Sequence, residues 1–179
     1  MSVHAQLRAD TRHIHEDVDQ AFGSADLGRA APYGEFLRKH GLALPPLERR
    51  LARVPGLPAF SPRLPMLTAD LDALGIGLPE PLDPGPAPSL AEALGMLYVL
   101  EGSRLGGVML SRQVGPGLPR SYLSAAHAKG EWRALLDRIE HLAPDAKAYP
   151  HLLAGAKRAF ALYLKAAQTA VHAAGGSGT

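Results

Sequence analysis

A histidine and two arginines near the N-terminus have spacings that place them on one side of a helix. Arg8 and Arg12 precede His15 by seven and three residues, and residues at such spacings are neighbours on a helix surface. A neutral imidazole is a good ligand for iron, and guanidinium groups pair well with carboxylates. The pattern therefore fits a flat apolar ligand that carries a metal and carboxylates, as heme does. The alternative is a hydrogen-bonded core histidine beside arginines that pair with neighbouring carboxylates.

His13 lies two residues before His15, but the pair does not form a zinc motif. Two residues correspond to about 200° around a helix, so the two imidazoles cannot bind one metal from the same helix. The sequence contains no His-Glu-x-x-His motif and no cysteine. It therefore excludes the common zinc-protease motif, thiolate metal sites and disulfides.

A second unusual stretch, YVLEGSRLGGVMLS at residues 98–111, carries three glycines within an apolar helix. Each interior glycine costs a helix about 1 kcal/mol relative to alanine, so the bare surface needs an explanation. Gly102, Ser103 and Gly106 share one side of that helix. A planar ligand could lie against this backbone and leave room for a small molecule such as O₂, although close helix–helix packing would explain the same glycines. Gly107, rotated by about 100°, is expected to serve a kink or a helix contact.

Helices must position these residues. The 179-residue chain is long enough to bury a core in one domain, and its Ala- and Leu-rich segments have helical spacing, whereas strand-forming residues are scarce. The sequence therefore predicts a single all-α domain over residues 1–174, followed by a flexible tail over 175–179. The expected helices span 4–22, 31–54, 65–74, 89–113, 123–141 and 147–174.

Local signals refine three of these helices. Pro45 and Pro46 are candidates for a break in the second helix. Ser89 and Glu92 predict a capping box at the start of the glycine-bearing helix. Apolar spacing also predicts a buried stripe along the first helix. The stripe consists of Leu7, Thr11, Ile14, Val18 and Phe22.

Composition excludes several classes of protein. A hydrophobic fraction of 46% and a charged fraction of 20% are ordinary for a globular protein. The sequence has no apolar run long enough for a membrane span, and its first residues lack the apolar region of a secretory signal. We therefore expect a cytoplasmic protein. A net charge of +2 without aromatic-interleaved basic runs does not indicate nucleic-acid binding.

The chain resembles heme oxygenases, particularly the biliverdin-producing bacterial branch often found beside bacteriophytochromes. LRADTRHIHE at residues 7–16 is similar to the family's first helix, where a histidine four residues after a threonine binds the iron. LGMLYVLEGSRLGG at 94–107 resembles the distal helix that kinks over the heme. AKRAF at 156–160 and MLTADLDALG at 66–75 are weaker matches. The resemblance covers most of the chain.

This resemblance implies the heme oxygenase fold, with heme held between the first helix and the glycine-bearing helix. The implied reaction is oxidative cleavage of heme to biliverdin, ferrous iron and CO, using O₂ and electrons from a separate reductase or ferredoxin. His15 would bind the iron, Phe160 would line the pocket, and Gly102 and Gly106 would let the backbone approach iron-bound O₂. A bacteriophytochrome that accepts biliverdin is an implied partner. The basic residues near the propionates fall on Arg8, Arg12 and Arg133.

Two positions depart from the family pattern. Asp137 falls about where some members have an arginine, so the propionate contacts are expected to differ. Ser103 stands where mammalian-type members have an aspartate that organises distal waters. A serine hydroxyl can hold a water but cannot supply the same charge. This departure motivates the alternative of a non-catalytic heme carrier or sensor, and a helical domain that binds no heme is a second alternative.

Overall fold

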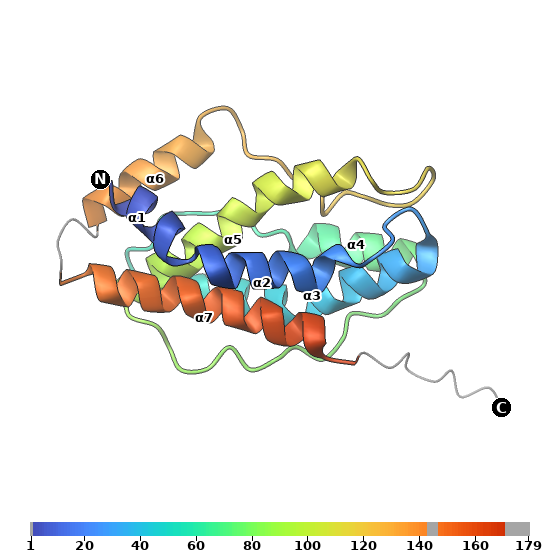
Figure 1. Ribbon diagram of the computed structural model, residues 1–179, viewed down its shortest axis with the longest axis horizontal. Helices are drawn as coiled ribbons and strands as arrows, with labels where there is room; N and C mark the ends of the chain where they lie inside the picture. Colours follow the sequence, from blue (N-terminus) through green and yellow to red (C-terminus); the bar gives the residue numbers. More distant parts are fainter. Residues whose placement is uncertain (1, 143–146, 171–179) are drawn as a thin grey trace.

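Seven α-helices make up the part of the chain that the structure describes, residues 2–142 and 147–170 (Figure 1). This computed structural model contains no strand within those ranges, which confirms the predicted all-α class. None of its helices is long and apolar enough to cross a membrane. The helices are α1 (Val3–Asp10), α2 (Arg12–Gly23), α3 (Ala30–Leu51), α4 (Leu64–Ala73), α5 (Leu90–Ser111), α6 (Glu131–Leu142) and α7 (Tyr149–Gln168).

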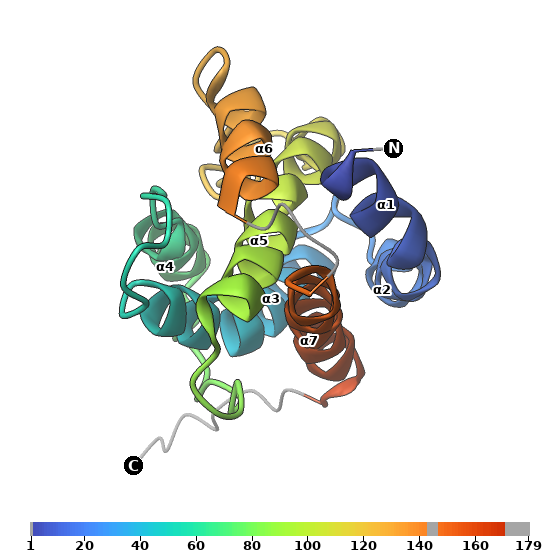
Figure 2. The ribbon, with the colours of Figure 1, turned by 90° about the vertical axis from the view of Figure 1, so that its left-hand side faces the viewer.

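Helices α5 and α7 form the centre of the molecule and pack closely along each other (Figure 2). Helices α2 and α3 pack on α7, and α4 packs on α3. Helix α6 lies against α5 and α1 at the end that holds the N-terminus (Figure 1). A shared core contains buried apolar residues of every helix except α2, whose apolar side chains are only half-buried. Helix α2 is therefore a surface helix held mainly against α7.

The expected helix over 4–22 is in fact two helices, α1 and α2, which meet at Thr11. Thr11 Oγ1 donates a hydrogen bond to the Leu7 carbonyl (2.7 Å), which also accepts the Thr11 N–H (3.0 Å). Such back-bonding by a threonine hydroxyl bends helices. On the N-terminal side of the bend, α1 contacts α6, where the His4 N–H donates to Glu140 Oε1 (3.0 Å). The predicted stripe is confirmed, with Leu7 and Thr11 buried and Ile14, Val18 and Phe22 half-buried.

Pro45 and Pro46 do not break α3, which continues through both to Leu51. A proline lacks the N–H that would bond the carbonyl four residues earlier. The Leu42 carbonyl, which Pro46 leaves free, instead accepts the N–H of Leu82 (2.9 Å). A backbone group from a distant segment therefore replaces the missing helical hydrogen bond, and it also fastens that segment to α3.

The predicted start of the glycine-bearing helix is confirmed, whereas the predicted start of the next helix is wrong. The capping box is present: Ser89 Oγ accepts the Glu92 N–H (3.3 Å), and Glu92 Oε2 accepts the Ser89 N–H (2.7 Å). The helix expected over 123–141 begins only at Glu131, because Gly130 has a φ of 83° that a helix cannot continue through. Residues 171–174 of the last expected helix, and the expected tail over 175–179, lie outside the described residues.

Two glycines outside the glycine-rich stretch allow α5 and α7 to touch through their backbones. A Cβ added to Gly95 would overlap the Leu152 carbonyl oxygen of α7, and one added to Gly155 would overlap the Glu92 carbonyl oxygen of α5. Small residues at a helix crossing permit this close approach. The packing seam of α5 therefore lies at Gly95, about two turns before Gly102.

We expect Gly155→Ala to lower the free energy of unfolding by about 1–3 kcal/mol, because the added methyl group forces two packed backbones apart. Urea denaturation followed by circular dichroism measures the change. Gly23→Ala is the matched control, since a Cβ there has no neighbour within 4 Å. A Gly155→Ala protein as stable as the wild type would contradict the close crossing.

Candidate functional site

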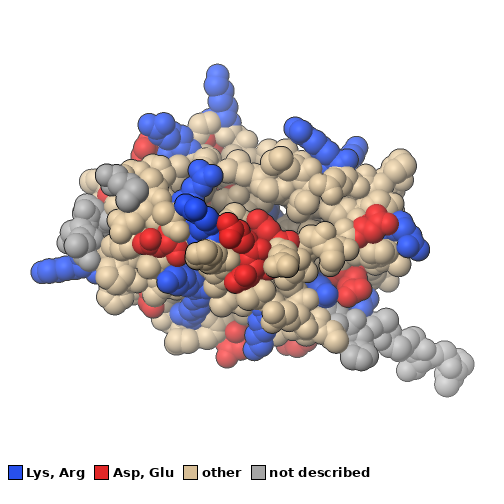
Figure 3. Space-filling view, viewed as in Figure 1, with Lys and Arg blue, Asp and Glu red and all other residues tan. Residues whose placement is uncertain are grey.

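An opening lies between α2 and α5, the two helices that carry the residues singled out in the sequence. Figure 3, viewed as in Figure 1, shows this opening near the middle of the face, where Figure 1 places the space between the two ribbons. Both helices pack on α7, so α7 forms the third side of the space. The opening is therefore bordered by the histidine-bearing helix, the glycine-bearing helix and the last helix.

His15 is an exposed residue of α2 that lies beside α7. Its side chain is 58% exposed, which excludes the core-histidine alternative. The centroid of its ring lies 5.1 Å from that of Phe160, so the structure brings these two predicted residues together. His15 Nε2 also lies 3.6 Å from Asp19 Oδ2. The ion pair is long and solvent-exposed, and such pairs contribute little free energy.

The glycines of α5 differ in what lies against them. A Cβ added to Gly106 would have no neighbour within 4 Å, so the backbone there is bare. At Gly107 it would lie 3.1 Å from the Leu123 carbonyl oxygen, so Gly107 makes a close contact with the turn that follows α5 and not the expected contact with a helix. At Gly102 it would lie 3.3 Å from Cη2 of Trp132. Trp132, the single tryptophan of the chain, therefore covers one end of the bare stretch.

The predicted basic residues lie on three helices, α1, α2 and α6. Arg8 and Arg12, at the end of α1 and the start of α2, have exposed side chains. Burial raises the pKa of the Tyr98 phenol on α5, and the charge of Arg8 lowers it, so Arg8 acts electrostatically across from α1 to α5. Arg133 is an exposed residue of α6, and its Nε lies 3.3 Å from Asp137 Oδ1. Arg133 therefore forms a surface ion pair with Asp137, the residue that stands where some heme-site patterns have an arginine.

The Ser103 hydroxyl is held by Arg63, a buried arginine that sequence analysis did not select. Arg63 Nη2 donates to Ser103 Oγ (2.7 Å) and to the Leu100 carbonyl (2.8 Å). Ser103 Oγ donates its own proton to the same carbonyl (2.7 Å). Arg63 is 2% exposed, and its backbone N–H donates to Glu48 Oε1 (2.6 Å). A hydroxyl with one donor and two acceptor sites therefore keeps one lone pair free.

His40 is a second histidine near the three helices that border the opening. Its ring contacts Phe22 of α2 (4.6 Å between centroids) and Tyr163 of α7 (5.5 Å). Its Nδ1 is joined to the Tyr122 hydroxyl by a hydrogen bond of 2.8 Å. Burial lowers the pKa of His40 to about 3, so this imidazole is neutral at physiological pH.

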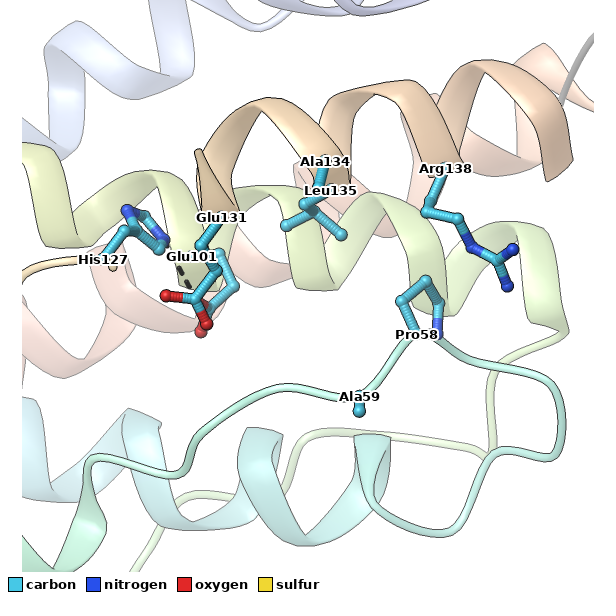
Figure 4. A pocket seen from close by; sticks show the side chains of 8 residues that line it. All are labelled: Pro58, Ala59, Glu101, His127, Glu131, Ala134, Leu135 and Arg138. Atoms are coloured by element: carbon cyan, nitrogen blue, oxygen red, sulfur yellow. Dashed lines mark hydrogen bonds and ion pairs between the residues drawn. The ribbon is translucent and has the colours of Figure 1, made fainter. Parts of the chain in front are cut away.

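A pocket of about 290 Å³ lies apart from these residues, between α6, Glu101 of α5 and the segment before α4 (Figure 4). At its inner end Glu101 Oε2 accepts a hydrogen bond from Arg104 Nε (2.9 Å) and lies 3.1 Å from His127 Nε2. Glu101 Oε1 and His127 Nδ1 are buried without a partner. Within the described ranges, no three His, Asp or Glu side chains are grouped closely enough to hold a metal ion. The pocket is lined by Pro58, Ala59, Glu101, His127, Glu131, Ala134, Leu135 and Arg138.

Comparisons with known proteins connect this arrangement to one family. A curated protein of Xanthomonas campestris named heme oxygenase is 33% identical, and the match covers 79% of this chain and 92% of that protein. Among solved structures, the NO- and CO-bound heme oxygenase from Neisseria meningitidis matches 99% of this chain and 98% of its own, with a TM-score of 0.79. Its sequence identity is 24%, so this match shows a shared fold. No protein-family model matches.

Proposed function

The chain belongs to the heme oxygenase family, and from that premise we propose that α2 and α5 hold heme between them. As a heme oxygenase it cleaves heme oxidatively to biliverdin, ferrous iron and CO, with O₂ and electrons supplied from outside. One observation carries the proposal about the site: the exposed ring of His15, beside Phe160, and the bare backbone at Gly106 belong to two helices that border the same opening.

His15 is proposed as the iron ligand. Its weak, exposed pair with Asp19 leaves the imidazole available at little cost in free energy. Phe160 gives the same side of the opening an apolar aromatic surface, which suits a flat porphyrin. Bound heme supplies the redox-active iron, and the chain supplies orientation and proton delivery.

On the opposite side, Gly106 is proposed to let the α5 backbone approach O₂. The absence of a side chain there leaves a space that any other residue would enter. Arg8, Arg12 and Arg133 are proposed contacts for the propionates, because guanidinium groups pair well with carboxylates. A reductase or ferredoxin is the proposed electron donor, and a bacteriophytochrome is a proposed acceptor of biliverdin.

Ser103 is proposed to orient the water that delivers protons. Its hydroxyl proton is engaged with the Leu100 carbonyl, and Arg63 occupies one of its lone pairs. A water can therefore bind only by donating to the remaining lone pair. Such a water keeps its second proton free to be donated toward the face of the heme that α5 covers, where O₂ is proposed to bind. The buried Arg63 thereby fixes the direction of a hydroxyl that would otherwise rotate freely.

We expect Ser103→Ala to lower kcat for biliverdin formation by about 10-fold or more while the dissociation constant for hemin stays the same, because it removes a proton-delivery group and not a binding contact. Ser103→Thr, which keeps a hydroxyl, should recover most of the rate. Single-turnover kinetics and hemin titration separate the two quantities. Equal kcat in Ser103→Ala and wild type would remove Ser103 from the mechanism.

A turnover assay tests the function itself. Protein loaded with hemin and given a reductant and O₂ should lose its Soret band and gain the absorbance of biliverdin, confirmed by chromatography of the product. A Soret band that persists through repeated additions of reductant would support the heme carrier instead.

A further inference from the structure

The indole of Trp132 makes the bare surface of α5 asymmetric. It lies against Gly102, where a Cβ would be 3.3 Å from Cη2, whereas nothing lies within 4 Å of the corresponding position at Gly106. Trp132 comes from α6, which packs on both α5 and α1 (Figure 2). The glycine-rich backbone is therefore covered at one end and open at the other.

The position of this indole is fixed by two aromatic contacts. Its ring centroid lies 5.7 Å from that of Tyr98 on α5, and 5.6 Å from that of His127, with which it stacks at an interplanar angle of 28°. Trp132 contacts both Tyr98 and the Gly102 backbone, and it is itself half-buried. The indole therefore behaves as a wall rather than as a freely rotating surface side chain.

His127 is in turn held by a buried ion pair of α5. Its Nε2 lies 3.1 Å from Glu101 Oε2, and Glu101 pairs with Arg104 (2.9 Å), as Figure 4 shows for the histidine and the carboxylate. Arg104 also donates to the Ala125 carbonyl (3.3 Å) and to the Ser61 carbonyl. These contacts tie the segment before α6 to α5, so buried groups of α5 hold His127, and His127 holds the indole of Trp132.

We infer that Trp132 determines which meso carbon of heme is oxidised. The inference rests on the proposed heme site between α2 and α5. A porphyrin carries methyl, vinyl and propionate groups of different size and charge around its edge, so its rotation in a pocket depends on which of them each wall admits. Trp132 excludes bulky edge groups from the Gly102 end and leaves the Gly106 end open to O₂. His127 is a positioning residue that acts through the indole.

The test compares wild type with Trp132→Ala, Trp132→Phe and Lys129→Ala, an exposed substitution in the segment before α6. Each protein is loaded with hemin and turned over, and the biliverdin isomers are separated by chromatography. The heme-methyl resonances of each ferric cyanide complex are recorded by proton NMR, which counts heme orientations without any turnover. His127→Ala is added to test the positioning residue.

Wild type and Lys129→Ala should give one predominant isomer and one predominant set of heme-methyl resonances. In Trp132→Ala the ratio of major to minor isomer should fall about 10-fold or more, because a large side chain that discriminates edge groups is lost, and a second set of resonances should appear. Trp132→Phe should give an intermediate ratio. If Trp132→Ala does not fold, the isomer ratio and heme-methyl resonances of Trp132→Phe provide the test. His127→Ala should shift the ratio in the same direction by less.

Unchanged isomer ratios and a single heme orientation in both Trp132 variants would overturn the inference while leaving the proposed function intact. A wild-type protein that binds hemin but forms no biliverdin would overturn the proposed function, and the heme-methyl resonances would then still decide whether Trp132 sets the orientation.

Discussion

His15→Ala should lose the Soret spectrum of a histidine-ligated heme and lower the rate of biliverdin formation at least about 100-fold, since the substitution removes the proposed iron ligand. The protein itself should fold normally. The His15 side chain is 58% exposed and makes only a long ion pair with Asp19 and a ring contact with Phe160. Substitutions at such positions usually change stability by less than about 0.5 kcal/mol.

His13→Ala is the matched control for this experiment. His13 lies on the same helix, its side chain is 98% exposed, and its nearest partner is Glu16 at 3.9 Å. It should keep the wild-type spectrum and rate. Added imidazole should restore the Soret spectrum of an imidazole-ligated heme to His15→Ala, because the free ligand can enter the space that the side chain leaves. A His15→Ala protein that retains the wild-type Soret band and turnover would contradict the ligand assignment.

The parts of the site that could be predicted from the sequence are those encoded within one helix. The helical period predicts that Gly106 and Gly107 face different sides of α5. In the structure Gly106 is bare, whereas Gly107 packs against the Leu123 carbonyl of a turn. The capping box at Ser89 is equally local, since its two groups are three residues apart. Such features need no knowledge of which helices are neighbours.

The parts that sequence reasoning missed depend on segments that meet only after folding. Arg63 reaches Ser103 from a proline-rich segment forty residues earlier, and no spacing rule connects the two. Trp132 reaches Gly102 from another helix, and its one signal was that it is the single tryptophan of the chain. The continuity of α3 through Pro46 was also unpredictable, because it depends on the N–H of Leu82 from a distant loop.

Gly95 and Gly155 serve the packing of α5 on α7, whereas the backbone at Gly106 is bare. Gly106→Ala therefore tests the role of the bare backbone without disturbing the packing. An added methyl group at Gly106 has no neighbour within 4 Å, and alanine is the better helix former by about 1 kcal/mol. The heme-free protein should therefore become more stable by up to about 1 kcal/mol. The same methyl group enters the space proposed for O₂, so biliverdin formation should slow by about 10-fold or more.

Gly95→Ala provides the opposite case on the same helix. Its methyl group would overlap the Leu152 carbonyl oxygen, so we expect a loss of about 1–3 kcal/mol of stability, with near-normal turnover in the fraction that stays folded. Thermal unfolding of the heme-free proteins and single-turnover kinetics of the hemin complexes measure the two effects separately. If Gly106→Ala turned over heme as fast as wild type, the bare backbone at Gly106 would have no part in the reaction, and α5 would no longer form the oxygen side of the site.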